Sequence, residues 1–258
     1  TWATSAEGVA TVSSAGLVTA ITNGSATITA TSGSVSATVT ATVSQVAASV
    51  TLAPTSLSFA SVDDTTTLVP TVRDANDNVM SGATVTWATS AEGVATVSSA
   101  GLVTAIANGT ATITATSGSV NATATATVSQ VATAVTLAPT SLSFASVSDT
   151  ATLVPTVKDA NDNVISGATV TWATSAEGVA TVSSAGLVTA VANGSATITA
   201  TSGSVNATAT ATVSQVATSV TLAPTSLNFA SLSDTATLVP TVKDANDNTI
   251  PIPTVTWA

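Results

Sequence analysis

The sequence predicts an all-β chain made of tandem antiparallel β-sandwiches, and three observations support this prediction. First, the 258-residue chain has an 85-residue period without an insertion, as its tryptophans show: Trp2, Trp87, Trp172 and Trp257. Second, apolar and polar residues alternate with a period of two along many short segments, which is the pattern of half-buried strands. Third, Gly, Pro, Asn and Asp residues recur at short intervals, and no segment has the periodicity of an amphipathic helix.

The first half of a period predicts three or four short strands. In residues 46–130, SVTLAPTSLSFAS gives a short strand, a proline break and a second short strand. TTTLVPTVRD then predicts one strand that contains Pro70. Because proline cannot donate a ladder hydrogen bond, we expect this strand at a sheet edge or with a bulge at Pro70. DANDN forms a turn before ATVTWATS, a strand whose Val85 and Trp87 point inward.

The second half of the period brings the total to about seven or eight strands. GVATVSS and GLVTAI are separated by an Ala-Gly turn. Asn108-Gly109 lies between two alternating runs, and we expect a type I′ hairpin there because Asn-Gly supplies the positive φ angles that this turn demands. The last strand, SVNATATATVS, places its apolar residues on one face: Val120, Ala122, Ala124, Ala126 and Val128.

Each period contains enough apolar residues for a core of its own. We expect its tryptophan to be buried between two sheets. In residues 46–130 the predicted neighbours of Trp87 are Leu57, Phe59, Leu68, Val85, Val97, Leu102 and Ile113.

The period divides the chain into four parts, with boundaries at the recurring VSQVA. Residues 46–130 and 131–215 are complete repeats, and they differ at 8 of 85 positions. Residues 1–45 correspond to the C-terminal part of a repeat and residues 216–258 to the N-terminal part, and these two parts complement each other. We favour the interpretation that the chain is a window from a longer covalent array. The alternative is that subunits complete each other's half-domains end to end.

Composition limits the classes of function. Charged residues make up 6% of the chain and the net charge is −10, so we expect no binding to nucleic acid or to other polyanions. Apolar runs are only a few residues long, far short of the roughly 20 needed for a transmembrane helix. The chain has no cysteine and therefore no disulfide.

Several motifs together resemble a known family. The segments SVTLAPTSLSF, DANDNVMSGATVTWATSAEGVATVSSAGLVTAIANGTATITATSG and ATATVS are similar to the group 2 bacterial immunoglobulin-like domain, and the resemblance covers the whole chain. It implies tandem immunoglobulin-like sandwiches of the kind found in the stalks of intimin- and invasin-type adhesins and in some phage and S-layer-associated proteins. In those adhesins binding usually resides in a separate tip domain, so a binding function does not carry over.

The residue inventory argues against an enzyme. The chain has no His, Cys or Tyr, so the usual general bases, thiol nucleophiles and imidazole ligands are missing. Glu92 with Asp74 or Asp77 supplies the two carboxylates that a glycosidase needs, but the same trio recurs in other periods. We therefore expect no catalytic residue and no cofactor.

DANDN is the one candidate metal site. Asp74, Asn76 and Asn78 have the i, i+2, i+4 oxygen spacing that begins a calcium loop, as do Asp159, Asn161 and Asn163. The glycine expected next is Val79, and the bidentate Glu expected at the loop end is Val85. The alternative, which we favour, is an Asx turn whose side chains bond to their own backbone.

Asn-x-Ser/Thr sequons make Asn23, Asn121 and Asn206 candidate glycosylation sites. Asn108 also begins a sequon, but there we favour its role in the hairpin.

These observations predict a structural function. We expect a rigid spacer or polymer in an extracellular bacterial surface stalk, adhesin or filament. Its partners would be neighbouring repeats of the same protein, with a homopolymeric filament as one form, and a host or cell-surface ligand that the sequence does not identify. The alternative is a carbohydrate- or cell-surface-binding module, including one that is phage-fibre or S-layer-associated.

Overall fold

The computed structural model describes residues 1–251 and 253–257. All regular elements in these residues are β-strands, and they include no helix long and apolar enough to cross a membrane. The chain divides into two compact units. One consists of Thr1–Phe59 and Thr65–Val128, and the other of Ala60–Asp64 with the chain from Ser129 onward.

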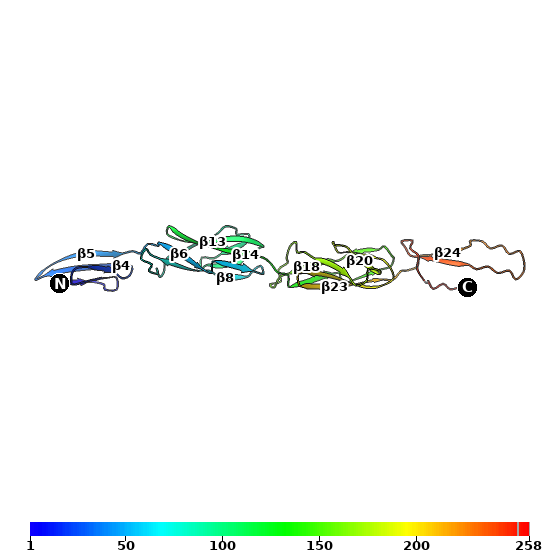
Figure 1. Ribbon diagram of the computed structural model, residues 1–258, viewed down its shortest axis with the longest axis horizontal. Helices are drawn as coiled ribbons and strands as arrows, with labels where there is room; N and C mark the ends of the chain where they lie inside the picture. Colours follow the sequence, from blue (N-terminus) through cyan, green and yellow to red (C-terminus); the bar gives the residue numbers. More distant parts are fainter. Residues whose placement is uncertain (252, 258) are drawn as a thin grey trace. The chain divides into compact units, whose positions relative to one another are not determined.

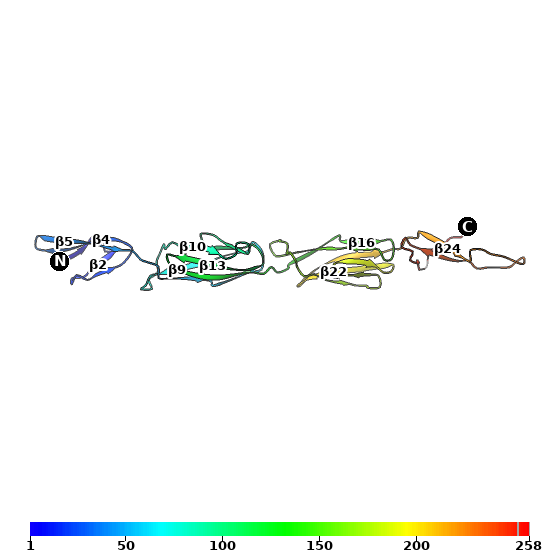
Figure 2. The same ribbon diagram turned by 90° about the horizontal axis from the view of Figure 1, so that it is seen from above.

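The first complete repeat, residues 46–130, contains nine strands rather than the seven or eight predicted. Figure 1 shows several of them in cyan and green, and Figure 2 shows β9, β10 and β13 from above. The strands are β6 (Ser49–Ala53), β7 (Ser56–Phe59), β8 (Thr65–Thr67), β9 (Val69–Arg73), β10 (Thr86–Thr89), β11 (Ala95–Val97), β12 (Leu102–Ala105), β13 (Gly109–Ser117) and β14 (Val120–Val128).

These strands form a four-stranded sheet in the order β10-β13-β14-β7, a three-stranded sheet β11-β12-β8 and the pair β6-β9. All the pairings are antiparallel except that of β7 with β14, which is parallel and joins the start of the repeat to its last strand. The fold is the tandem immunoglobulin-like sandwich that the sequence predicted.

The second complete repeat, residues 131–215, has the same order of strands and sheets. Its strands are β15 (Ala134–Ala138), β16 (Ser141–Phe144), β17 (Thr150–Thr152), β18 (Val154–Lys158), β19 (Thr171–Thr174), β20 (Ala180–Val182), β21 (Leu187–Ala190), β22 (Gly194–Ser202) and β23 (Val205–Val213).

Two further segments flank the complete repeats. The N-terminal segment, residues 1–45, forms the sheet β1-β4-β5 and the pair β2-β3, and the C-terminal segment, residues 216 onward, forms the pair β24-β25. Their strands are β1 (Trp2–Thr4), β2 (Ala10–Val12), β3 (Val18–Ala20), β4 (Gly24–Ser32), β5 (Val35–Val43), β24 (Ser219–Ala223) and β25 (Val239–Lys243).

Each complete repeat has its own apolar core, built by alternation along the strands. In β14, Ala124, Ala126 and Val128 are buried and the threonines between them are exposed, as predicted. The largest fully buried side chains of the first complete repeat are Leu68, Val103 and Ile113. Burial of such side chains is the main contribution to the stability of a domain of this size.

The hairpin predicted at Asn108-Gly109 is wrong. β12 pairs with β11 and β8, whereas β13 pairs with β10 and β14, so this stretch carries the chain from one sheet to the other. Gly109 is needed for another reason, because a Cβ there would lie 2.9 Å from Cγ2 of Val94. The two-residue hairpin lies instead at Gly118-Ser119, between β13 and β14. Gly118 has φ 60°, the positive value that the first central residue of a type II′ turn takes.

The predicted core is wrong at Leu102, which is exposed, while its neighbour Val103 is fully buried. β12 pairs with β11 so that Val103 lies opposite Val97 and Ala105 opposite Ala95. Opposite residues of an antiparallel pair share a face, so the inward face of β12 carries Val103 and Ala105.

The tryptophan lies at the rim of the core rather than at its centre. Trp87 is half-buried and packs against the core cluster of its repeat. It belongs to β10, the edge strand of the four-stranded sheet, so its side chain has a neighbouring strand on one side only. Its ring lies close to Gly101, where an added Cβ would be 2.8 Å from Cζ2 of Trp87.

The single strand predicted around Pro70 is two strands in different sheets. β8 pairs with β12 and β9 pairs with β6, and Leu68 between them is fully buried. Pro70 lies in the two-stranded β6-β9 pair, opposite Leu52, which agrees with the expectation that this proline avoids a central strand.

Candidate functional site at the repeat junctions

The DANDN motif forms a tight turn directly after β9 and β18, and its first aspartate organises that turn. Oδ1 of Asp159 accepts hydrogen bonds from the backbone N–H of Asn161 at 3.0 Å and of Asn163 at 2.9 Å. Asp162 has φ 66°, which aspartate tolerates better than most residues. Asp74 makes the same bonds with Asn76 and Asn78 at 3.0 and 2.9 Å. This geometry supports the Asx-turn alternative.

The second oxygen of Asp159 is occupied by the preceding repeat. Oδ2 accepts a hydrogen bond from the backbone N–H of Val62 at 2.9 Å and another from Nε2 of Gln130 at 2.8 Å. Val62 belongs to the loop of residues 60–64, which is part of the same compact unit as Asp159. Asp159 itself is only 2% exposed.

The two asparagines of the motif bond back to the same loop. Nδ2 of Asn161 donates to the carbonyl oxygen of Val62 at 2.8 Å and to Oδ1 of Asp64 at 3.0 Å. Nδ2 of Asn163 donates to the carbonyl oxygen of Val62 at 3.1 Å and to Oδ2 of Asp63 at 3.2 Å. We call this set of bonds between the DANDN turn, the preceding glutamine and the preceding loop the junction clamp.

The loop is shaped to present the groups of Val62. Asp63 has φ 67°, and Oδ2 of Asp64 accepts the backbone N–H of Ser61 at 3.0 Å. Ser61 is almost fully buried. The bond between Asp64 and Ser61 therefore fixes the loop in a conformation in which the backbone N–H and carbonyl of Val62 can bond to the next repeat.

The junction clamp recurs at the end of the second complete repeat. Oδ2 of Asp244 accepts from the backbone N–H of Val147 at 2.9 Å and from Nε2 of Gln215 at 2.9 Å. Nδ2 of Asn246 donates to the carbonyl oxygen of Val147 at 2.9 Å and to Oδ1 of Asp149 at 2.8 Å.

The first junction has only part of the clamp. Nε2 of Gln45 donates to Oδ2 of Asp74 at 2.8 Å, as its equivalents do. Asp74 is half-buried, whereas Asp159 and Asp244 are buried. A hollow of about 470 Å³ lies beside it, and its lining includes Gln45, Asp74, Asn76 and Asn78.

The clamp shifts the pKa of each aspartate. Burial raises the pKa of Asp244, but bonds from the side chain of Gln215 and from the backbone N–H groups of Val147, Asn248 and Asn246 outweigh it and lower the pKa to about 2. The pKa of Asp159 is lowered by the same balance of burial and hydrogen bonds. At Asp74 the bond from Gln45 is the main cause of a lowered pKa. All three groups are thus held as carboxylates at neutral pH.

The metal prediction is untested by these contacts. The carboxylate oxygens of the motif face N–H donors, and the described residues contain no group of three or more acidic side chains placed to hold a metal ion. Calcium at Asp74, Asn76 and Asn78, or at Asp159, Asn161 and Asn163, stays an untested alternative to the Asx turn that we favour.

The candidate glycosylation sites lie in two settings. Asn121 on β14 and Asn206 on β23 are exposed on the outer face of their strands. Asn23 is exposed as well, but its Oδ1 accepts the backbone N–H of Gln45 at 2.7 Å. Asn193 makes the same bond with Gln215 at 2.7 Å, so this asparagine links the start of a long strand to the end of its partner.

Comparison with protein families gives a match over most of the chain. The bacterial Ig-like domain (group 2) matches residues 1–43, 46–128 and 131–213. No curated protein matches the chain.

Several solved structures are similar to the chain. Domains 1–6 of the surface layer protein SbsC share 22% identity over 96% of this chain and 38% of that chain, with a TM-score of 0.34. Invasin, described as a bacterial integrin-binding protein, shares 20% identity over 80% of this chain and 48% of that chain, with a TM-score of 0.41. The Escherichia coli adhesin FdeC shares 18% identity over 76% of each chain, with a TM-score of 0.38. The chain spans 38% and 39% of the two SbsC structures that contain domains 1–6 and residues 31–844.

Proposed function

The chain belongs to the group 2 bacterial Ig-like family, and from this premise we propose that it is a spacer segment of a stalk or filament on the outside of a bacterial cell. In this role the repeats catalyse no reaction. They hold a distant part of the protein, or another molecule, away from the cell surface.

The observation that carries this proposal is the junction clamp. Asp159 accepts four hydrogen bonds from N–H donors, and two of these donors, Val62 and Gln130, belong to the preceding repeat. Hydrogen bonds to a charged carboxylate are stronger than neutral ones, and breaking them inside a buried site leaves the charge without partners. Bending at the junction would break the bonds from the preceding repeat, so the clamp stiffens consecutive repeats against rotation.

The boundaries of the repeats are part of the same proposal. We place them at Gln45/Val46, Gln130/Val131 and Gln215/Val216, where the last residue of one repeat is the glutamine of the clamp. A spacer built in this way needs no linker, because the repeat ends in its own attachment to the next one.

A carbohydrate-binding module is less well supported. Sugar sites commonly present exposed aromatic rings. In the complete repeats Phe59 and Phe144 are buried, and Trp87 and Trp172 are half-buried against their cores. The outer faces of these repeats present mainly threonine, serine and asparagine.

The coupling of repeats is tested by measuring distances between spin labels. The chain has no cysteine, so Thr123→Cys and Thr208→Cys give two unique attachment points on exposed positions of β14 and β23. We expect a narrow distance distribution. Asp159→Asn should broaden the distance distribution. The side-chain oxygen of the new asparagine can still accept the N–H groups of the DANDN turn, but its NH₂ group would face the N–H of Val62, and two donors cannot bond to each other.

Asp162→Asn is the matched control. It removes the same charge three residues away, at an exposed carboxylate whose partner is Lys158 at 3.5 Å. The distribution should stay narrow. Equal distributions for Asp159→Asn and the unsubstituted chain would show that the clamp does not couple the repeats, and the spacer proposal would lose its support.

The cellular location is tested on the source bacterium. Antibodies raised against residues 46–215 should label intact cells as strongly as permeabilised ones. Labelling that requires permeabilisation would contradict the location outside the cell.

A further inference from the structure

An Asn-Gly pair recurs at one point of every period, directly before a long strand. The pairs are Asn23-Gly24, Asn108-Gly109 and Asn193-Gly194. In each pair the glycine is the first residue of β4, β13 or β22, and the asparagine is exposed. A Cβ at each glycine would lie 2.9–3.0 Å from Cγ2 of a valine. This close packing accounts for the glycine but not for the asparagine.

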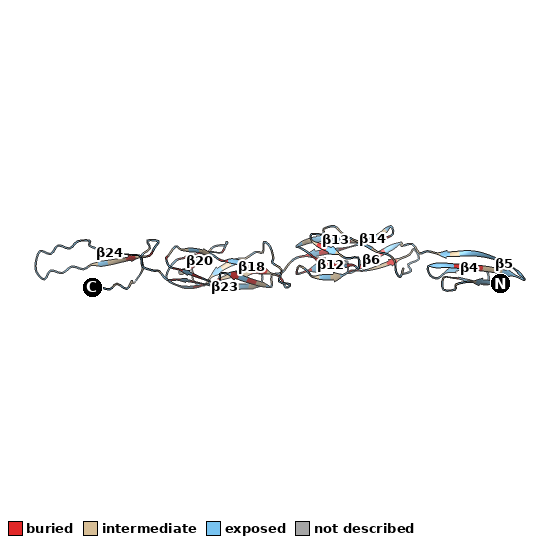
Figure 3. Ribbon diagram, turned by 180° about the vertical axis from the view of Figure 1, so that it is seen from behind, coloured by how far each residue is buried: buried red, intermediate tan, exposed pale blue. Residues whose placement is uncertain are grey.

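The side chain of Asn193 takes the place of a backbone carbonyl at the end of a ladder. The last rung between β22 and β23 pairs Gly194 with Val213, and β23 (Figure 3) ends two residues before Gln215. One more hydrogen-bonded rung would pair Gln215 with Ala192. The chain has already turned away there, because the N–H of Ala192 bonds to the turn before β20 at 3.3 Å. Oδ1 of Asn193 accepts the N–H of Gln215 instead, at 2.7 Å.

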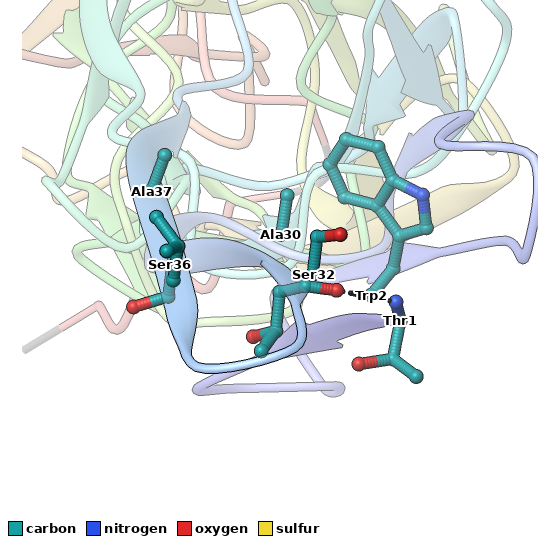
Figure 4. A pocket seen from close by; sticks show the side chains of 8 residues that line it. Thr1, Trp2, Ala30, Ser32, Ser36 and Ala37 are labelled. Carbon is teal, nitrogen blue, oxygen red and sulfur yellow. Dashed lines mark hydrogen bonds between the residues drawn. The ribbon is translucent and has the colours of Figure 1, made fainter.

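The pair of β4 and β5 shows the same arrangement, with both ends of its ladder closed. At one end a two-residue turn joins the strands, and Figure 4 shows side chains beside this turn, with Ser32 on β4 and Ser36 on β5. Beyond the other end, Oδ1 of Asn23 accepts the N–H of Gln45 at 2.7 Å. The asparagine therefore fixes the end of the strand pair that lies far from the hairpin.

The glutamine that is held in this way is the glutamine of the junction clamp. Nε2 of Gln45 donates to Oδ2 of Asp74 at 2.8 Å, and Nε2 of Gln215 donates to Oδ2 of Asp244 at 2.9 Å. A glutamine side chain has several rotatable bonds, so holding it against a carboxylate costs conformational entropy. The bond from the asparagine already removes the freedom of the glutamine backbone. Only the freedom of the glutamine side chain then opposes the clamp.

This chain of bonds from asparagine through glutamine to aspartate forms without the rest of the clamp. At the first junction Asp74 accepts bonds from its own turn and from Gln45, and the bond from Gln45 is the main cause of its lowered pKa. Asn23 holds Gln45 at that junction as well. The chain of bonds therefore does not depend on the loop that contributes to the other two clamps.

We propose that Asn23 and Asn193 are positioning residues of the junction clamp. Each holds the backbone of the following glutamine, so that the glutamine side chain reaches the aspartate of the next repeat. Asn108 stands 22 residues before Gln130, the same separation as in the other two pairs, and the proposal includes it. The inference rests on the proposed spacer function and deepens it, because it places control of the clamp on a residue whose own bond lies inside the preceding repeat.

The proposal is tested on the carboxyl group of Asp244, whose pKa is followed by NMR titration of the whole chain. Gln215→Ala removes the side-chain donor and should raise this pKa from about 2 toward 3.8. Asn193→Ala leaves that donor in place but frees its backbone, and we expect at least about half of the same rise. The amide hydrogen of Gln215 should also exchange at least about 10-fold faster in Asn193→Ala, because its acceptor is lost.

A double substitution separates positioning from a general loosening of the fold. Once Gln215 is replaced by alanine, Asn193 has no donor left to position, so adding Asn193→Ala should raise the pKa of Asp244 no further. A further rise would show that the asparagine acts by supporting the fold, and would overturn the proposal. An unchanged pKa in Asn193→Ala alone, with faster exchange of the Gln215 amide, would overturn it as well.

Two control variants use the same measurements. Asn206→Ala removes an exposed asparagine from β23 and should change neither the pKa of Asp244 nor the exchange of the Gln215 amide. Asn193→Asp keeps an acceptor oxygen and should keep this exchange slow. Equal effects of Asn206→Ala and Asn193→Ala, or fast exchange in Asn193→Asp, would contradict a positioning role.

The first junction provides an independent copy of the test. If Asn193→Ala fails to fold, Asn23→Ala is compared with Gln45→Ala through the pKa of Asp74, and the same relation between the two rises is expected. The spin-label distances show whether the clamp couples the repeats, whereas these titrations follow only the bonds from asparagine to aspartate. A failure of the positioning role is therefore distinguished from a failure of the spacer function.

Discussion

Two glycines of the first complete repeat separate the effect of backbone strain from that of close packing. Gly82 and Gly101 both have φ 79°, a value that residues with a Cβ adopt at a cost. A Cβ at Gly82 would meet no atom within 4 Å. A Cβ at Gly101 would lie 2.6 Å from the backbone oxygen of Leu68 and 2.8 Å from Cζ2 of Trp87. The change to alanine therefore adds the same strain at both positions and a steric clash at only one.

The expected losses follow from these distances. Positive φ costs an alanine about 1–2 kcal/mol, and the lower entropy of the unfolded chain offsets about 0.4–1 kcal/mol of this. Gly82→Ala should therefore destabilise the repeat by about 1 kcal/mol. Gly101→Ala adds overpacking, which costs about 1–3 kcal/mol, so its total is about 2–4 kcal/mol. For a domain of this size that corresponds to a midpoint roughly 10–20 °C lower.

The assay follows the unfolding of this repeat alone through Trp87. Changing the other three tryptophans to phenylalanine leaves its fluorescence as the signal, and both alanine variants are melted in that background. The second complete repeat provides an independent copy: a Cβ at Gly186 would lie 2.8 Å from Cζ2 of Trp172, whereas one at Gly167 would meet nothing within 4 Å. Equal losses for the crowded and the open glycine would refute the reasoning, because strain alone would then explain both.

Three further predictions test the core and the motif. Val103→Ala should lower the free energy of unfolding by about 2 kcal/mol in urea titrations, and Leu102→Ala by less than about 1 kcal/mol, because only Val103 is buried. The pKa of Asp244 is lowered from an ordinary 3.8 to about 2, so its carboxylate contributes stability that is complete above about pH 4 and is lost as the pH falls toward 2. The urea midpoints of the unsubstituted chain and of Asp244→Asn should therefore differ at pH 7 and converge at pH 2. Added calcium or chelator should leave the thermal midpoint unchanged, because Asp74 already accepts N–H donors at both oxygens; a shift would favour a calcium site.

The sequence was informative where one pattern has one structural meaning. The 85-residue period and the alternation in β14 both depend on which residues face a core, and the structure agrees with them. The fold class followed because no helical periodicity competes with the strand pattern in any segment.

The sequence misled where one pattern serves two structures. Asn108-Gly109 has the composition of a hairpin turn, but Gly109 is present because Val94 packs against its backbone. In GLVTAI, Leu102 and Val103 are both apolar, so either of two registers would place an apolar side chain inward. Only the pairing of Val103 with Val97 across β11 and β12 decides between them.

The junction clamp was not visible in the sequence because its key donor is a backbone amide. Val62 and Val147 both donate their backbone N–H to the aspartate of the next repeat. The residue that follows differs, because Asp63 follows Val62 and Ser148 follows Val147. Asn163 donates to the carboxylate of Asp63, whereas Asn248 has no such carboxylate there and donates to the carbonyl oxygen of Val147 at 2.9 Å. No side-chain pattern marks such a donor. What marks it is spacing: the glutamine and the aspartate of every clamp are 29 residues apart, and the loop amide and the aspartate are 97 residues apart in both complete clamps. If one residue were inserted between this loop and the DANDN motif of the next repeat, the loop amide would reach the aspartate carboxylate only if a bulge or a longer turn accommodated the extra residue. This requirement is a physical reason why the period of the array does not vary.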